Sequence, residues 1–405
     1  ALHQNVLYDR VPAARRAQLH LRIGERLEHG YDSESSHISG ALARHFELGN
    51  DSRRAVRYLG HAAQNAMRKH AYRETIDILT HALGLLRSWP ETPERMQQEL
   101  PLQITLGVAL LMTRGFTAPE VEAVYARAHA LCQQLGDSPQ LFPVLEGLQT
   151  FYAVRGELPT AHVLAEQMFA LAQHTQEPGL LLEAHHVIGD SLLMQAEFTQ
   201  AHTHLAQAVR IYDPQQHGHH AFLYSGHDPG VCCSGYLGFV LWDLGYPEQA
   251  LEQSHRAIAI AQAIAHPYSH AMSLFHNAYL YYLLRDSAQA QQQAEAAMAL
   301  AAEHSFPDWT VTSMIVRGWA LAIQGQAAEG LEQIRQGMEA CQAIGIRLGW
   351  SGMAYQLAEA CGKAEQYDEG LRVVDEALQK TPYDGERCYE TELYRLKGAL
   401  TLQQE

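Results

Sequence analysis

Small and hydrophobic residues recur along this chain at a spacing that predicts paired helices. Six predicted turns fall at Gly156, Ala196, Gly245, Arg285, Gly325 and Glu365. Five positions after each turn stands a small residue: Ala161, Ala201, Ala250, Ala290, Gly330 and Gly370. The interval between successive turns is constant, except for a longer one from Ala196 to Gly245. A fixed period of about 40 residues is typical of a helical repeat protein.

Each repeat reads as two antiparallel helices in close contact. Small residues also stand seven positions before several turns, as at Gly189 and Gly318, while bulky residues such as Leu192 stand four before. The distance between packed helices is set by the side chains at their contact, so such positions permit a close approach. Pro178 and Pro307 fall where first helices should start, since proline lacks the N–H that a first turn leaves unpaired.

This pattern resembles the tetratricopeptide repeat, whose usual period is about 34 residues. The resemblance implies an all-α superhelical solenoid of helix pairs, here with the longer period of about 40 residues. We place the repeat domain at residues 38–405 and the tail end of a winged-helix or linker region at 1–37. Further helices are predicted at 39–48, 52–69, 73–86, 94–113, 119–135 and 386–404. A non-repeating helical bundle is the alternative.

The long interval contains nine extra residues, placed within 213–229. This insertion carries four histidines followed by a cysteine pair: His217, His219, His220, His227, Cys232 and Cys233. Imidazole and thiolate are natural ligands of transition metals. Their spacing fits no established closed zinc site, and interspersed glycines indicate a loop. We therefore interpret the insertion as a solvated loop, and we expect neither a metal nor a cofactor.

Charge is distributed unevenly. The net charge is −16, yet residues 1–73 carry 12 Lys/Arg against 7 Asp/Glu, leaving −21 for the remainder. An acidic body argues against nucleic-acid binding by the whole surface.

Six cysteines without a C-x-x-C pair indicate a reducing compartment. No apolar run approaches the ~20 residues of a membrane span, so a cytoplasmic protein is expected.

Several segments resemble bacterial STAND-class signalling ATPases of the predictive ATPase, cyclase-associated type. They are LHQNVLYDRVPAARRAQLH at 2–20, HFELGNDSRRAVRYLGHAAQNA at 45–66, YDPQQHGHHAFLYSGHDPGVCC at 212–233 and ELYRLKGALTLQQ at 392–404. The resemblance implies a sensor and autoinhibitory repeat domain, with an ATPase module on its N-terminal side and a cyclase- or transcription-linked output. The basic head then docks onto that module, and DNA is not an expected partner. The chain has no G-x-x-x-x-G-K-[S/T] phosphate loop, so it is not expected to be an enzyme itself.

In tetratricopeptide arrays the first helices line the concave groove. The positions ten, six and three residues before each turn should face this groove, and we call them the groove columns. They supply the candidate binding residues Asp190, Phe239, Trp242, Phe275, Tyr279, Tyr282, Trp319, Tyr355 and Glu359. Aromatic rings flanked by charge suit a peptide, a protein segment or a small-molecule inducer. Two alternatives remain open: a superhelix that buries these rings against its own next turn, and a passive assembly scaffold without a ligand switch.

Overall fold

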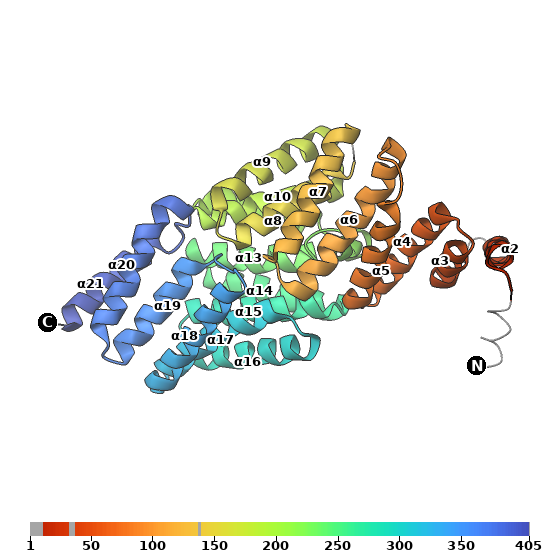
Figure 1. Cartoon of the computed structure of the whole chain (residues 1–405). Helices are drawn as coiled ribbons and strands as arrows, with labels where there is room; N and C mark the ends of the chain where they lie inside the picture. Colours follow the sequence, from red (N-terminus) through yellow and green to blue (C-terminus); the bar gives the residue numbers. More distant parts are fainter. Residues whose placement is uncertain (1–10, 32–36, 137–138, 405) are drawn as a thin grey trace. The chain divides into compact units, whose positions relative to one another are not determined.

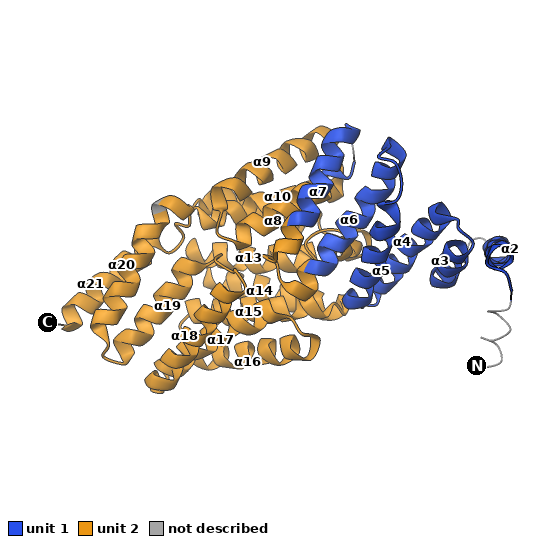
Figure 2. Ribbon diagram, in the orientation of Figure 1, with its two compact units in different colours: residues 1–110, 123–141 blue, residues 111–122, 142–405 orange. Residues whose placement is uncertain are grey.

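The computed structural model describes residues 11–31, 37–136 and 139–404. Within these ranges it contains 20 α-helices, one short 3-10 helix and no strand (Figure 1). The helices form two compact units (Figure 2). Unit 1 comprises residues 1–110 and 123–141, and unit 2 comprises 111–122 and 142–405. The predicted tail region at 1–37 lies partly outside the described residues.

Unit 1 contains the predicted upstream helices, with boundaries within one residue of those expected. They are α3 (Ser39–Leu48), α4 (Ser52–Arg68), α5 (Tyr72–Leu86), α6 (Pro93–Arg114) and α7 (Pro119–Leu135), preceded by α2 (Ala13–Tyr31). Residues 111–122, at the end of α6 and the start of α7, are assigned to unit 2. The core between α3 and α4 includes the stacked rings of Phe46 and Tyr58, 5.6 Å apart.

Unit 2 alternates first and second helices of the repeat. The first helices are α8 (Leu141–Val154), α10 (Pro178–Met194), α13 (Pro229–Asp243), α15 (Pro267–Leu283), α17 (Pro307–Ile323), α19 (Trp350–Lys363) and α21 (Glu390–Gln404). The second helices are α9 (Leu158–Thr175), α11 (Phe198–Ile211), α14 (Pro247–Ile264), α16 (Ser287–His304), α18 (Ala327–Ala343) and α20 (Tyr367–Asp384). All six predicted turn residues adopt a left-handed backbone, with φ between 59° and 93°. The register of the repeat is therefore confirmed, and the fold is an all-α, tetratricopeptide-like array of helix pairs.

Small residues bring the two helices of a repeat together. A Cβ atom added to Gly318 on α17 would lie 2.8 Å from the carbonyl oxygen of Gly330 on α18. The same atom would lie 2.9 Å from Ile334, so no side chain fits between the two backbones. Ala250 and Ala290 occupy the position of Gly330 in earlier repeats, and both are fully buried. The spacing of small residues thus sets the helix contact.

In unit 2, a repeat contacts the repeat that stands five repeats later along the chain. The carbonyl oxygen of Val154, at the end of α8, accepts hydrogen bonds from the amides of Arg347 (2.8 Å) and Leu348 (3.1 Å), before α19. One repeat further along, Met194 accepts a hydrogen bond from the Arg387 amide at 2.8 Å, before α21. Because the same contact recurs, the array in unit 2 curls until its first helices surround a common interior.

The insertion at 213–229 is folded, and its interpretation as a solvated loop is wrong. It forms α12 (Pro214–His217) and the 3-10 helix η2 (Gly218–Phe222). Its residues His217, His220, Tyr224 and Ser225 are at most 5% exposed. Two of its polar side chains, His220 and Ser225, are buried and hydrogen-bond to carboxyl groups on α10 and α8, which are distant in sequence.

None of the helices in the described ranges is both long and apolar enough to span a membrane.

Candidate functional site

The first helices of unit 2 enclose a cavity of about 270 Å³. Its walls include eight aromatic and three thioether side chains: Phe116, Tyr236, Phe239, Trp242, Phe275, Tyr279, Trp309, Tyr389, Met194, Met272 and Met353. These residues come from α10, α13, α15, α17 and α19 and from the segments before α7 and α21. A concave apolar site with a few polar groups is the usual form of a small-ligand pocket.

Half-buried rings form a continuous row along one wall of the cavity. The ring centroids of Phe239 on α13 and Tyr279 on α15 are 5.3 Å apart. Phe275 lies 6.0 Å from Tyr279 and 5.5 Å from Trp309 on α17. Such offset and edge-on contacts are favourable between aromatic rings. The row therefore offers a rigid apolar surface assembled from three successive repeats.

Several buried polar atoms of the cavity wall have no hydrogen-bond partner among the described residues. They are Asp190 Oδ1, His276 Nδ1, Asp308 Oδ1, Trp309 Nε1 and Gln356 Oε1. Buried polar groups are nearly always hydrogen-bonded, because leaving one unpaired costs about 1–3 kcal/mol. The set includes both donors and acceptors. Together these atoms can orient a ligand that fills the apolar space.

Acidic side chains also line the cavity. Asp190, Asp243, Asp308 and Glu392 lie in its wall, and no Lys or Arg is among the described residues that line it. Burial raises the pKa of Asp308 to about 7, and the Tyr268 hydroxyl donates to its Oδ2 at 3.5 Å. Burial also lowers the pKa of His276 to about 3, so this imidazole is neutral at physiological pH. Burial likewise raises the pKa of Asp243 to about 7, so a cation beside Asp243 or Asp308 would stabilise the charged form of either carboxyl.

A second recess of about 740 Å³ adjoins the first cavity. The two share Trp242, Leu283, Tyr389 and Glu392 in their walls. Its remaining lining carries charges of both signs, including Arg285 and Arg395. The apolar cavity therefore borders a wider polar recess along these shared residues.

The structure divides the nine predicted groove residues among three places. Asp190, Phe239, Trp242, Phe275 and Tyr279 line the first cavity. Tyr282, Tyr355 and Glu359, together with Trp242, line the recess. Trp319 lines neither.

Trp319 lies in the hydrophobic core and not in the groove, contrary to the prediction. Its ring is fully buried, and its Nε1 donates to Glu359 Oε2 at 2.7 Å. The ring of Tyr282 meets it edge-on at 4.8 Å. The self-burial alternative thus applies to this residue, because an aromatic neighbour and a carboxylate enclose it.

Asp308, Trp309 and His276 line the cavity but are not among the nine groove residues predicted from the sequence. The columns used for prediction began ten positions before each turn, whereas Asp308 and Trp309 lie earlier, in the first turn of α17. If the same spacing is continued by two helical turns towards the start of α17, it includes both residues. His276 lies one position after the Phe275 column, and no periodic signal marks it.

A network of buried acids and imidazoles borders the cavity at α10. Glu183 accepts from the Nδ1 atoms of His220 (2.7 Å) and His186 (3.4 Å). Burial acts to raise the pKa of Glu183, but these hydrogen bonds hold it at about 2. Glu146 on α8 accepts from the backbone amide of Ser225 at 3.1 Å and from its hydroxyl. The insertion is thus fixed to α8 and α10 by buried hydrogen bonds to carboxyl groups.

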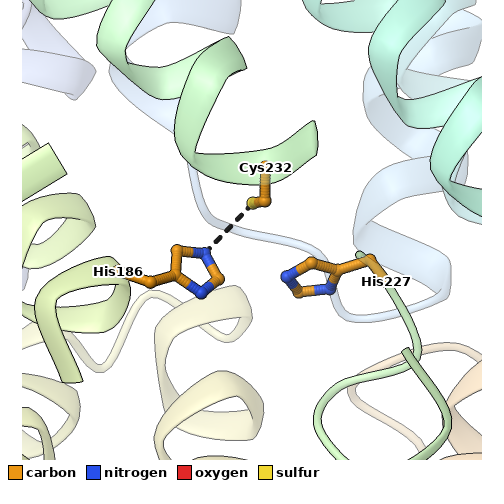
Figure 3. A group of neighbouring side chains, drawn as sticks. All are labelled: His186, His227 and Cys232. Atoms are coloured by element: carbon orange, nitrogen blue, oxygen red, sulfur yellow. Dashed lines mark hydrogen bonds between the residues drawn. The ribbon is translucent and has the colours of Figure 1, made fainter. Parts of the chain in front are cut away.

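The start of α13 is positioned by the same insertion. Asp228 caps this helix, accepting from the Val231 amide at 3.0 Å, and the Tyr212 hydroxyl donates to its other oxygen at 2.9 Å. The Asp228 amide in turn donates to Ser269 Oγ on α15 at 2.8 Å. These bonds hold His227 and Cys232 on either side of the cap, facing His186 on α10 (Figure 3).

A curated protein is similar in sequence to nearly the whole of this chain. No family model matches this chain. An uncharacterised protein of Rhizobium meliloti (strain 1021) is 24% identical over 402 residues, which are 98% of this chain and 39% of that protein. The chain therefore spans about two fifths of the length of that curated relative.

Two solved structures share the arrangement of helices. A Rap protein complexed with Competence and Sporulation Factor has a TM-score of 0.58 at 11% identity, covering 86% of this chain and 99% of that one. The Rap conjugation gene regulator of the plasmid pLS20, in complex with the Phr* peptide, has a TM-score of 0.53 at 12% identity. That match covers 80% of this chain and 96% of the other. At such identities the likeness concerns the fold alone.

Proposed function

We propose that this chain is a ligand-binding sensor module, and that its ligand occupies the cavity of unit 2. The observation that carries the proposal is the cavity wall itself. It combines an aromatic row with unpartnered polar atoms such as Asp308 Oδ1 and Trp309 Nε1. A ligand that pairs these atoms recovers hydrogen bonds that the described residues leave unmade, and it gains apolar contact with the rings.

The ligand we propose has an apolar body and one cationic group, as a short peptide with a basic residue has. Asp243 and Asp308 favour positive charge nearby, since burial raises the pKa of both carboxyls and a cation would stabilise their charged form. The pLS20 regulator named above binds the Phr* peptide, which supports a peptide occupant for the same fold. The adjoining recess gives room for a chain that extends beyond the cavity.

Signalling requires that the ligand distinguish two states of the protein. A ligand shifts an equilibrium only by its differential affinity for the two states. In the proposed mechanism, the peptide binds the curled form, in which repeats five apart touch, more tightly than an opened form. Contacts such as Val154 to Arg347 are then the ones that the ligand stabilises.

We further propose that the module regulates a STAND-class ATPase on its N-terminal side in the cytoplasm. The support is the sequence resemblance described above, together with a relative of which this chain matches 39%. The role assigned to this chain is binding, with no chemical step. A cyclase- or transcription-linked output belongs to the same proposal.

The competing function is a passive scaffold. In that case partners bind the second helices on the outside of the array, and the acidic lining of the cavity has no effect on binding. The exposed faces of α14 and α16 are available for such contacts. The location of binding separates the two functions.

The proposal is tested by thermal shift with two peptide pools. One pool contains short peptides with aromatic residues and one lysine, and the matched pool carries acetyl-lysine instead. Ligand at 100 times its dissociation constant stabilises the native state by about 2.7 kcal/mol. We expect only the basic pool to raise the melting temperature, and Asp308→Asn to reduce the rise.

Glu303→Gln, an exposed change on α16, serves as the matched control and should leave the rise intact. Equal shifts from both pools, or none from either, would contradict the proposed ligand class.

A further inference from the structure

Three side chains beside the cavity have the composition of a metal centre. His186 lies on α10, His227 precedes α13, and Cys232 stands in the first turn of α13 (Figure 3). One ligand atom from each lies within 4.8 Å of the other two. His186 and Cys232 are each 3% exposed, and all three residues line the cavity.

We propose that His186, His227 and Cys232 bind a divalent transition metal ion, with zinc the best match, and leave one coordination position open to the cavity. Zinc takes imidazole nitrogen at about 2.0–2.1 Å and thiolate sulfur at about 2.3 Å, in tetrahedral geometry. These bond lengths place adjacent ligand atoms roughly 3.5 Å apart. His186 Nε2 and Cys232 Sγ are already 3.1 Å apart, so a small outward shift admits the ion.

The outer hydrogen bonds of both imidazoles suit this role. His186 Nδ1 faces Glu183 Oε2 at 3.4 Å, and His227 Nδ1 faces the Ser225 carbonyl oxygen at 3.3 Å. Both partners are acceptors, so each histidine carries a ring proton on Nδ1. Metal-binding histidines commonly show this pattern, because it directs Nε2 to the ion and fixes the orientation of the ring.

Electron-rich atoms converge on His186 Nε2. Cys232 Sγ lies 3.1 Å from this nitrogen, and Asp190 Oδ2 lies 3.2 Å from it. A metal ion bound at this place accepts electron pairs from the imidazole nitrogen and the sulfur together. It also compensates the buried carboxylates, which otherwise carry a large desolvation cost.

This inference departs from the sequence-based expectation of no metal, and it uses only part of the histidine run. His227 and Cys232 are five positions apart, whereas His186 stands far earlier in the chain, on another helix. His217 and His219 take no part. The site is independent of the proposed peptide: a chain that binds zinc but no peptide would retain this inference and lose only the proposed function.

The test is a Co²⁺ titration of the full chain, reduced and freed of metal by a chelator. Thiolate-bound Co²⁺ absorbs strongly in the near ultraviolet, so the ligand type is visible directly. We expect the absorption to saturate at one equivalent and to vanish when Zn²⁺ displaces Co²⁺. We also expect Zn²⁺ to raise the melting temperature of the wild type.

Matched variants locate the site. Cys232→Ser should abolish the thiolate absorption, and His227→Gln should weaken Co²⁺ affinity at least ~10-fold. Cys233→Ser is the control, because Cys233 is adjacent, equally buried and outside the ligand group. Circular dichroism checks that each variant is folded. Should Cys232→Ser fail to fold, the half-buried His227 provides the decisive variant.

Two outcomes would overturn the inference. One is a wild-type chain that shows no thiolate absorption with Co²⁺. The other is a folded His227→Gln variant with wild-type affinity and an undiminished thermal shift, which would place the metal elsewhere among the 24 histidines.

Discussion

The hydroxyl of Tyr279 donates a hydrogen bond to the hydroxyl of Tyr389 at 2.8 Å, although the two residues are 110 positions apart. Tyr279 stands on α15, and Tyr389 immediately precedes α21. Both rings line the cavity. This bond therefore closes the cavity across the interior of unit 2, between repeats that are not neighbours in sequence.

Tyr279→Phe removes this closure and keeps the ring. A typical net hydrogen bond contributes about 0.5–1.5 kcal/mol, so we expect a loss of that size in the free energy of unfolding. Urea denaturation measures it. Tyr383→Phe is the control, since that side chain is 83% exposed and should be neutral. Equal effects of the two changes would show that the cross-cavity bond does not hold the unit closed.

Gly318→Ala tests the close helix contact. The new methyl group would lie 2.8 Å from the Gly330 carbonyl oxygen, and overpacking of this kind costs about 1–3 kcal/mol. Gly398→Ala on α21 has no heavy atom within 4 Å and should stabilise the helix by about 0.5–1 kcal/mol. The unfolding midpoints of the two variants should therefore move in opposite directions. A shift of Gly318→Ala in the stabilising direction would refute the assigned packing.

His220→Ala tests the burial of the insertion. The change leaves the buried Glu183 carboxylate without its shortest hydrogen bond, 2.7 Å, and should cost about 1–3 kcal/mol. His219→Ala, the adjacent change at an exposed position, should cost almost nothing. Chemical denaturation compares them. If both histidines are dispensable, the insertion is a loop in solution after all.

Asp308→Asn should change stability in a pH-dependent manner. The pKa of Asp308 is raised by burial to about 7, whereas in the unfolded chain it is about 3.9. Between these values only the native state holds the proton, so the stability that this group contributes falls as pH rises from the unfolded pKa through the folded one. Asparagine does not titrate. Relative to wild type, the variant should therefore gain more than about 1 kcal/mol between pH 5 and pH 8.

Urea midpoints of wild type and variant at the two pH values measure this gain. A difference between the proteins that is the same at pH 5 and pH 8 would show that Asp308 does not titrate in this range. Glu303→Gln again supplies the exposed control, with no expected pH dependence.

The repeat could be predicted because its signals are local. A turn at Gly245 and a small residue at Ala250 belong to one helix pair, and the same relation recurs in each of the six repeats. The insertion could not be predicted, because its composition of Gln, His and Gly is that of a solvated loop. Its burial depends on Glu146 and Glu183, which lie 79 and 37 residues away from their partners.

The candidate site shows the same division. Phe239, Phe275 and Tyr279 follow from the column spacing, since each occupies the concave side of its own helix. Burial of Trp319 depends on Tyr282 and Glu359, which lie in neighbouring repeats, so position in one helix does not determine it. His186 meets Cys232 only when α10 and α13 pack together.

The proposed sensor function depends on where the ligand binds. The most direct measurement is photo-crosslinking with a lysine-containing aromatic peptide that carries a benzophenone, followed by mass spectrometry. Three methionines of the cavity wall, Met194, Met272 and Met353, are reactive targets for this group. We expect adducts at one or more of these three methionines, and we expect Asp308→Asn to suppress them. Adducts confined to Met298, a half-buried residue on α16, would place binding on the second helices and contradict the proposal.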